Sequence, residues 1–336
     1  MKKIAFIDLN FHKKTKSSIF FQDILSKHFN LNVYYENERE KYINDKFDKY
    51  IFWQVIPDFL DLIKIKNKEI ILIPMYDSTP INKLAWERYK CFKIRIVCFC
   101  KKLYNFFSNI WFDCIYIQYF MPPLKYEINY SNKNIFFRYR WNITRENVKT
   151  IIWGQKVSIT IKNNPDPWYR PIELSKEEIK KYNVSFLNKF FDTKDEYIEN
   201  LANHSIFIAP RKQEWIWMSF LESMNLWQCV IAYNDATMNE YISNWKNWIL
   251  TDFKEYVSLD DYKNLWNNSK KNYIVGYKKW INDINNVINF IYKENNKRPK
   301  TISILDYIID FLIKIRRFFL KLKILKKITI KSNIFN

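Results

Sequence analysis

The chain has 336 residues, of which 48% are hydrophobic, and a formal net charge of +20 at pH 7. This length and apolar content predict two globular domains with separate cores and exclude a largely disordered protein. No stretch reaches the roughly 18 uncharged apolar residues of a spanning helix. The apolar run after Met1 is also too short for a signal peptide. The charge indicates an acidic partner, which can be a membrane surface, a nucleic acid or nucleotide phosphates.

The cysteines carry no metal-binding pattern. Their odd number and irregular spacing predict reduced cytosolic thiols rather than a metal site or a disulfide framework. They are Cys91, Cys98, Cys100, Cys114 and Cys229. No D-x-D motif stands out at the end of a strand. We therefore expect neither a metal nor another cofactor.

Glycine is almost absent, because the chain holds only Gly154 and Gly276, whereas tryptophan reaches 13. Ordinary usage of about 7% would give roughly 23 glycines. A protein of this size needs glycine where φ is positive or where the backbone approaches a phosphate. We hypothesise that several tryptophans are UGA codons that the source organism reads as glycine; the alternative is a diverged protein with genuine tryptophans. The positions in question are Trp111, Trp215, Trp217, Trp227, Trp245, Trp248 and Trp266.

The first part of the chain alternates strand and helix patterns. Residues 4–9 predict a buried first strand, and a polar, basic loop at 10–18 leads into a helical pattern. Further strands are expected at 31–35, 50–56, 70–74, 94–100 and 115–120, with helices at about 59–65 and 102–110. This alternation predicts a parallel sheet with helices on both faces.

A polar segment with prolines, residues 121–133, indicates a domain boundary. The alternation then restarts, with strands expected at 134–139, 156–161, 183–187 and 206–209 and helices at about 144–152, after 175 and at 192–202. Two helices are expected between residues 258 and 293. The predicted domains are therefore 1–125 and 126–295, followed by a tail at 296–336.

The tail is basic and partly apolar. From Lys314 to Lys331 it holds eight basic residues and no acidic one. A basic amphipathic helix of this kind commonly lies on anionic lipid, although a solvated helix is the alternative. We expect a cytoplasmic protein that is peripheral at the inner face of the cell membrane.

Residues 206–250 are the most informative stretch. Glu214 and Glu222, with seven residues between them, lie between an apolar run that ends at Pro210 and a second one at 229–232. The pattern predicts strand, loop, helix and strand, with Glu214 in the loop and Glu222 in the helix. A loop that leads from a parallel strand into a helix N-terminus is where α/β sheets bind anionic ligands.

This stretch resembles the donor-site signature of retaining GT-B glycosyltransferases of family 4, which is E-G-x-G-x-x-x-L-E-A-M, then G-x-x-V-I-A and E-Y-I-x-x-G-x-N-G-x-L. The match runs through the segments 221–224, 230–232 and 240–242. Five tryptophans take glycine positions of the signature, at 215, 217, 227, 245 and 248. The resemblance implies an α/β fold of the GT-B type, with two Rossmann-like domains and a cleft between them, here followed by a basic C-terminal helix.

The resemblance also implies an activity, the transfer of a hexose with retention from a nucleotide-diphospho sugar to a cell-surface glycan or lipid-linked acceptor. Glu214 would be catalytic and contact the donor sugar, and Glu222 would bind the ribose. The other donor-binding candidates are Arg211, Lys212, Trp217, Met218, Ser219, Phe220 and Arg140, with Arg138 beside the last. The amides of residues 217–220 would hold the diphosphate.

Acceptor-side residues are less well defined by the sequence. His12, in the loop after the first strand, is a candidate, but no partner carboxylate for it is evident from the sequence. Asp77 and Ser78 follow a strand and are interpreted either as acceptor contacts or as turn and capping residues.

Two other interpretations stay open. The charge of +20 is compatible with a nucleic-acid- or membrane-binding protein. Genuine tryptophans in the signature would favour an inactive transferase homologue. Because no zinc-finger or RNP signature is present, we expect no nucleic-acid partner. The expected partners are a nucleotide sugar, the acceptor and an anionic membrane surface.

Overall fold

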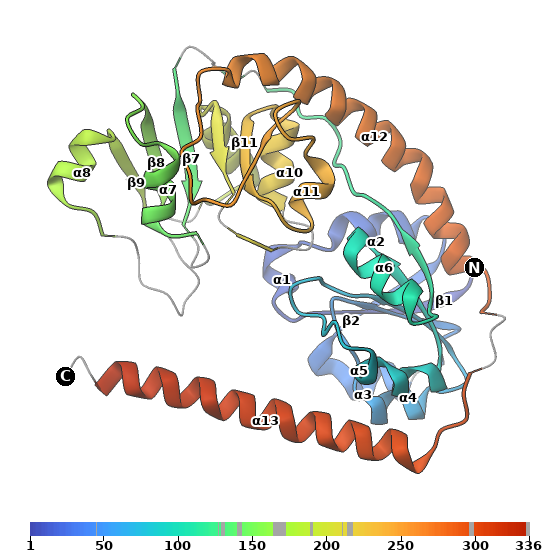
Figure 1. The fold of residues 1–336 in the computed structure, drawn as a ribbon. Helices are drawn as coiled ribbons and strands as arrows, with labels where there is room; N and C mark the ends of the chain where they lie inside the picture. The colour runs from blue at the N-terminus through green and yellow to red at the C-terminus, as the bar shows by residue number, and fades with distance from the viewer. Residues whose placement is uncertain are drawn as a thin grey trace.

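The computed structural model describes residues 1–44, 46–126, 128, 132–139, 143–163, 173–188, 191–209, 211–213, 218–295 and 299–333. Two parallel sheets, each covered by helices, organise these residues (Figure 1). The first sheet ends at Tyr116 and the second begins at Asn134. The predicted α/β fold with two Rossmann-like domains is therefore confirmed.

The first sheet has six strands in the order β2-β1-β3-β4-β5-β6, all paired in parallel. They are β1 (Lys3–Asp8), β2 (Asn30–Tyr35), β3 (Lys49–Trp53), β4 (Glu69–Ile73), β5 (Lys93–Cys98) and β6 (Asp113–Tyr116). The helices of this domain are α1 (His12–Thr15), α2 (Ile19–Ser26), α3 (Arg39–Asn44), α4 (Phe59–Lys64), α5 (Lys83–Glu87) and α6 (Lys101–Asn109), with 3-10 turns η1 (Glu36–Glu38) and η2 (Arg88–Cys91). Strands β3 and β4 are buried throughout, as expected for strands covered on both faces.

The second sheet has six strands in the order β12-β11-β10-β7-β8-β9. They are β7 (Asn134–Arg138), β8 (Ser158–Lys162), β9 (Val184–Leu187), β10 (Ile206–Ile208), β11 (Cys229–Tyr233) and β12 (Ile249–Thr251). Its helices are α7 (Arg145–Ile151), α8 (Lys176–Lys181), α9 (Lys194–Ala202), α10 (Met218–Asn225) and α11 (Met238–Tyr241).

The strand order locates the places where each sheet is able to bind a ligand. In a doubly wound sheet, ligands bind at the carboxyl ends of the two strands where the winding direction reverses. The strand orders place this reversal between β1 and β3 in the first sheet and between β7 and β10 in the second. Asp8 ends β1 and Arg138 ends β7, so polar residues lie at both points.

A long helix, α12 (Tyr262–Tyr292), runs from the second domain to the first (Figure 1). At its C-terminal end, the Lys49 ammonium donates to the carbonyl of Lys293 at 2.6 Å, and the Arg95 guanidinium donates to the carbonyls of Phe290 and Lys293. Cations at this end of a helix offset its dipole. Burial, followed by the charge of Arg95, lowers the pKa of Lys49 to about 8. The first sheet thus holds the last turn of α12.

The prediction of two helices between residues 258 and 293 is wrong, because α12 is continuous over this region. Gly276 lies inside it, and a Cβ at this position would overlap the ring of Phe120. Glycine therefore lets the helix pass close to the segment that connects the two sheets. A second terminal helix, α13 (Ile304–Asn333), follows.

Among the described residues, three tryptophans have a left-handed backbone, with φ of 70° at Trp111, 63° at Trp227 and 57° at Trp245. For residues that have a Cβ, this conformation costs roughly 1–2 kcal/mol, so glycine is the usual occupant. Trp248 differs, because its indole is buried and donates to the carbonyl of Gln228 at 2.9 Å.

Trp111 occupies the helix-ending position that glycine most often takes. Its N–H donates to the carbonyl of Ser108 at 3.0 Å, and the N–H of Phe112 donates to that of Phe107 at 3.1 Å. These two bonds form the Schellman motif, whose residue after the cap is left-handed. Trp227 ends α10 with the same two bonds. The indole of Trp111 is 79% exposed, so backbone conformation rather than packing dominates at this position.

We predict that Trp111→Gly is more stable than Trp111→Ala by about 1 kcal/mol, because only glycine removes the left-handed penalty. Equilibrium urea unfolding of the two variants measures the difference. Trp153 is the matched control, since it is also exposed after a helix but its φ is not positive. There, alanine should equal or exceed glycine. An alanine variant at 111 as stable as the glycine variant would contradict the argument.

Candidate functional site

The carboxyl ends of both sheets meet at the boundary between the domains. Arg211 follows β10, and its Nη1 lies 3.5 Å from Oδ2 of Asp77, which follows β4. The ammonium of Lys102, in the first turn of α6, lies 3.1 Å from a carboxylate oxygen of Asp235, which follows β11. Residues that follow strands of both sheets therefore contact one another.

Glu240, on α11, contacts the first domain through both its carboxylate and its backbone carbonyl. Its carboxylate accepts from the backbone N–H of Lys101 at 2.9 Å and from the hydroxyl of Tyr116 at 2.9 Å. Gln118 donates to its backbone carbonyl at 2.8 Å. A carboxylate at the N-terminus of α6 also complements the helix dipole. Burial, followed by the charge of Glu240, raises the pKa of Cys100 to about 12. This part of the signature thus holds the two domains together.

Glu222 is buried inside α10, with 5% of its surface exposed. Its carboxylate oxygen lies 3.5 Å from the ammonium of Lys194, at the start of α9. Burial raises the pKa of Glu222, and the positive charges of Lys194 and Arg138 oppose that rise. Because Arg138 ends β7, these contacts place the carboxylate of Glu222 beside the β7–β10 switch point of the second sheet.

A third cation, Lys162, ends β8 next to Arg138 on β7. Its ammonium lies 4.2 Å from the ring centroid of Phe191 and 5.3 Å from that of Tyr197. Arg138, Lys162 and Lys194 therefore form a basic cluster around one end of the sheet. Lys162 and Lys194 carry no motif, so the sequence did not reveal them as site residues, whereas the strand order brings them together.

The side chains at the start of α10 face the protein interior. Phe220 is 3% exposed and its ring lies 5.9 Å from that of Tyr241; Ser219 is also buried. Met218 is half-buried. The role predicted for Met218, Ser219 and Phe220 belongs to their backbone N–H groups. The burial of their side chains therefore does not test that prediction.

Arg211 and Lys212 have partners within the protein. Arg211 pairs with Asp77. Burial raises the pKa of Asp77, and the charge of Arg211 opposes this rise only in part. The ammonium of Lys212 lies 5.4 Å from the ring centroid of Tyr233. Neither contact involves the basic cluster. Three other predicted site residues, Glu214, Trp217 and Arg140, lie outside the described residues, as does Trp215.

His12 has a partner carboxylate that the sequence pattern did not reveal. Its Nδ1 lies 2.5 Å from Oδ1 of Asp8, which is 1% exposed, and the hydroxyl of Ser18 donates to the other oxygen of Asp8. The predicted loop at 10–18 contains the short helix α1, which begins at His12 and brings the ring back over Asp8. From the sequence, Asp8 was placed only within the predicted strand at residues 4–9. The pair lies at the switch point of the first sheet.

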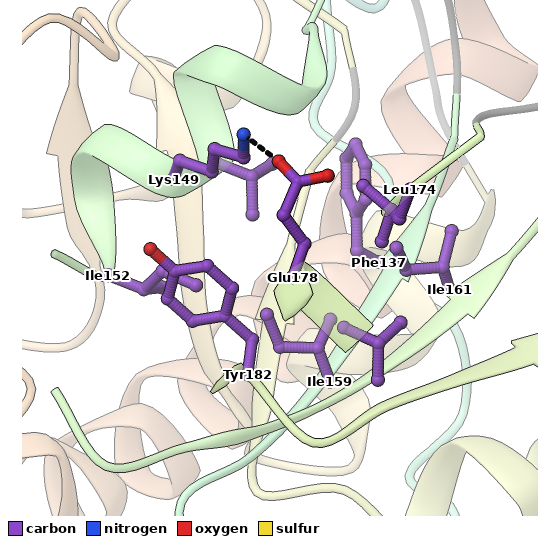
Figure 2. Close-up of a pocket in the computed structure, with 10 residues that line it drawn as sticks. Phe137, Lys149, Ile152, Ile159, Ile161, Leu174, Glu178 and Tyr182 are labelled. Carbon is purple, nitrogen blue, oxygen red and sulfur yellow. Dashed lines mark ion pairs between the residues drawn. The ribbon is translucent and has the colours of Figure 1, made fainter. Parts of the chain in front are cut away.

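A small cavity lies under α7 and α8, against the second sheet (Figure 2). Its volume is about 30 Å³, and its walls are mostly apolar, with the Lys149–Glu178 ion pair beside them. Ligand pockets are on the order of 300–1,000 Å³, so this is a packing gap. Within the described part of the chain, no three His, Cys, Asp or Glu side chains are placed to hold a metal ion.

Comparison with known proteins identifies the fold. No family model and no curated protein sequence matches the chain. Among solved structures, HepE of Anabaena in complex with UDP and glucose has 12% identity and a TM-score of 0.59, covering 87% of this chain and 99% of that one. Sucrose-phosphate synthase of Thermosynechococcus elongatus has 9% identity and a TM-score of 0.63, with the same coverage. The chain has the GT-B fold. The lipopolysaccharide outer core galactosyltransferase WaaB shares this GT-B fold, with 10% identity, a TM-score of 0.54 and coverage of 87% and 100%.

We predict that Glu222→Gln stabilises the protein by about 1 kcal/mol at pH 8, because a buried carboxylate is replaced by a neutral amide. Since burial raises the folded-state pKa, the stability of the wild type falls as pH rises through that pKa. The advantage of the variant should vanish below the ordinary value of 4.5, where the acid is neutral in both states. Urea unfolding across pH measures this, with exposed Glu255→Gln as the control. If the stability gained by Glu222→Gln did not depend on pH, the burial of the carboxylate charge could not be its cause.

Proposed function

We propose that the protein is a retaining glycosyltransferase that moves a hexose from a nucleotide-diphospho sugar to a cell-surface glycan or lipid-linked acceptor. The observation that carries this proposal is Glu222, buried beside the switch point of the second sheet with Lys194 and Arg138 around it. The sequence signature that contains Glu222 supports it. The GT-B fold adds support, because HepE, with the same fold, has been solved with UDP and with UDP-glucose.

In the proposed donor site, different residues would bind the ribose, the diphosphate and the sugar. The carboxylate of Glu222 would accept hydrogen bonds from two ribose hydroxyls, which a carboxylate does well. The N–H groups at the start of α10, with Arg138, Lys162 and Lys194, would neutralise the departing diphosphate. With this positive charge supplied by the protein, the proposal requires no metal. Glu214 would contact the transferred sugar.

The acceptor would bind at the facing end of the first sheet. Asp8 holds Nδ1 of His12, so Nε2 is the ring nitrogen that would meet an acceptor hydroxyl. A buried carboxylate of this kind fixes both the orientation and the tautomer of an imidazole. Arg211 and Asp77, which join the two domains, would lie at the border of donor and acceptor sites.

We predict that Glu214→Ala lowers sugar transfer by about 100-fold or more without loss of stability, because it removes a charged contact to the transferred sugar. A panel of UDP- and GDP-sugars, screened first by donor-induced thermal stabilisation, supplies the donor. Exposed Glu255→Ala is the matched control and should retain full activity. Transfer that survives in Glu214→Ala would refute the assignment.

The tryptophans bear on the same site, and we propose that those at the signature's glycine positions are glycines in the cell. The left-handed backbone at Trp227 and Trp245 supports this for two of the five, and Trp111 adds a third position outside the signature. The transfer assay therefore compares the chain that has tryptophan at these positions with the variant Trp215→Gly/Trp217→Gly. We expect more activity from the glycine variant. UGG codons at 215, 217, 227, 245 and 248 would contradict recoding and favour an inactive homologue.

A further inference from the structure

The face of α13 that packs on the protein carries two buried carboxylates, with half-buried Ile309 and Ile313 beside them. Asp306 is fully buried, accepts from the N–H and hydroxyl of Ser303 at 2.8 Å, and lies 3.1 Å from the ammonium of Lys300. One turn later, Asp310 is 5% exposed and lies 3.3 Å from Nε of Arg88, on η2. These carboxylates fix the first half of the helix to the first domain, where α13 contacts α5 and η2.

The opposite face of α13 is a broad apolar row that points away from the protein. Large apolar residues recur every three or four positions, the spacing that places side chains on one face of a helix. They are Ile304, Leu305, Ile308, Phe311, Leu312, Ile315, Phe318 and Phe319, and all are exposed, Phe311 to 63%. A helix of a soluble domain normally turns this face to the core. Contiguous exposed apolar surface marks a site of interaction.

Charge identifies the partner of this face. Arg316 is exposed on the same helix, whereas the ammonium of Lys314 pairs with Asp310 and Asp58 on the protein side. From Lys314 to Lys331 the sequence has eight basic residues and no acidic one. Basic residues beside an exposed apolar row fit an anionic lipid surface, to which each contributes about 1 kcal/mol. In a second copy of the chain, by contrast, the same positive charges would face each other. Among the helices that the structure describes, none combines the length and the hydropathy of a membrane-spanning segment.

We propose that α13 is a membrane-docking helix whose outward apolar row enters the interface of an anionic bilayer. Asp306 and Asp310 hold its other face to the first domain. The second half of α13 projects beyond that domain (Figure 1). This arrangement would tie the protein to the membrane surface, and the proposal is independent of the proposed transferase activity.

Vesicle flotation of the full chain tests the proposal. The wild type should float with vesicles of equal parts phosphatidylcholine and phosphatidylglycerol, and less with phosphatidylcholine alone. The triple variant Ile308→Gln/Phe311→Gln/Phe318→Gln should lose affinity about tenfold or more, because three apolar side chains no longer enter the lipid. Its thermal unfolding should be unchanged, since all three side chains are exposed.

The matched control removes three exposed apolar residues elsewhere, in Leu60→Gln/Val275→Gln/Ile281→Gln, and should float like the wild type. Equal flotation of the two triple variants would overturn the proposal, as would a wild type that binds no anionic vesicles. Light scattering distinguishes a second copy as partner: a wild-type dimer that becomes monomeric in the α13 variant, without vesicle binding, would also overturn it. Binding to duplex DNA without vesicle binding would do the same.

Discussion

The carboxylate of Glu240 contacts the first turn of α6, and the relative placement of the two domains depends on this contact. It joins α11 of the second domain to the backbone of Lys101 and the hydroxyl of Tyr116 in the first. The hydroxyl of Tyr241, the next residue, donates to the carbonyl of Tyr119 at 3.1 Å. The first sheet holds the far end of α12 through Lys49 and Arg95. Together these contacts keep the carboxyl ends of the two sheets facing each other.

This arrangement gives each domain a polar site at its own switch point. In the first domain Asp8 and His12 form the pair, and in the second Glu222 lies beside cations from β7 and α9. A reaction between a nucleotide sugar and an acceptor needs two such sites that face each other. The GT-B fold supplies that geometry, and these residues would supply the chemistry.

The sequence predicted the elements better than their contacts. Most strands are apolar runs bounded by polar turns, so their positions were evident, and residues 134–139 match β7 to within one residue. The short strand β12 was not predicted. The continuity of α12 was missed, because Gly276 serves a contact with Phe120, which lies far away in the chain, rather than a break between two helices. Asp8 was missed because the short helix α1, which was predicted as a loop, brings His12 back onto it. Lys162 and Lys194 were missed because only the packing of β8 and α9 in the second domain brings them near Arg138 and Glu222. The sequence also did not show that the apolar row of α13 points outward, because this depends on Asp306 and Asp310 fixing the opposite face to the first domain.

The central claim is that a nucleoside diphosphate binds between β7, β10 and α10. Hydrogen–deuterium exchange with and without UDP or GDP, alone or as the sugar conjugate, tests it most directly. We predict slower exchange of backbone amides at the start of α10 and at the ends of β7 and β10, because bound phosphates accept from those amides and exclude water. The strands of the first sheet distant from the domain boundary should be unaffected. Unchanged exchange of α10 with every nucleotide, or protection confined to the first domain, would contradict the account.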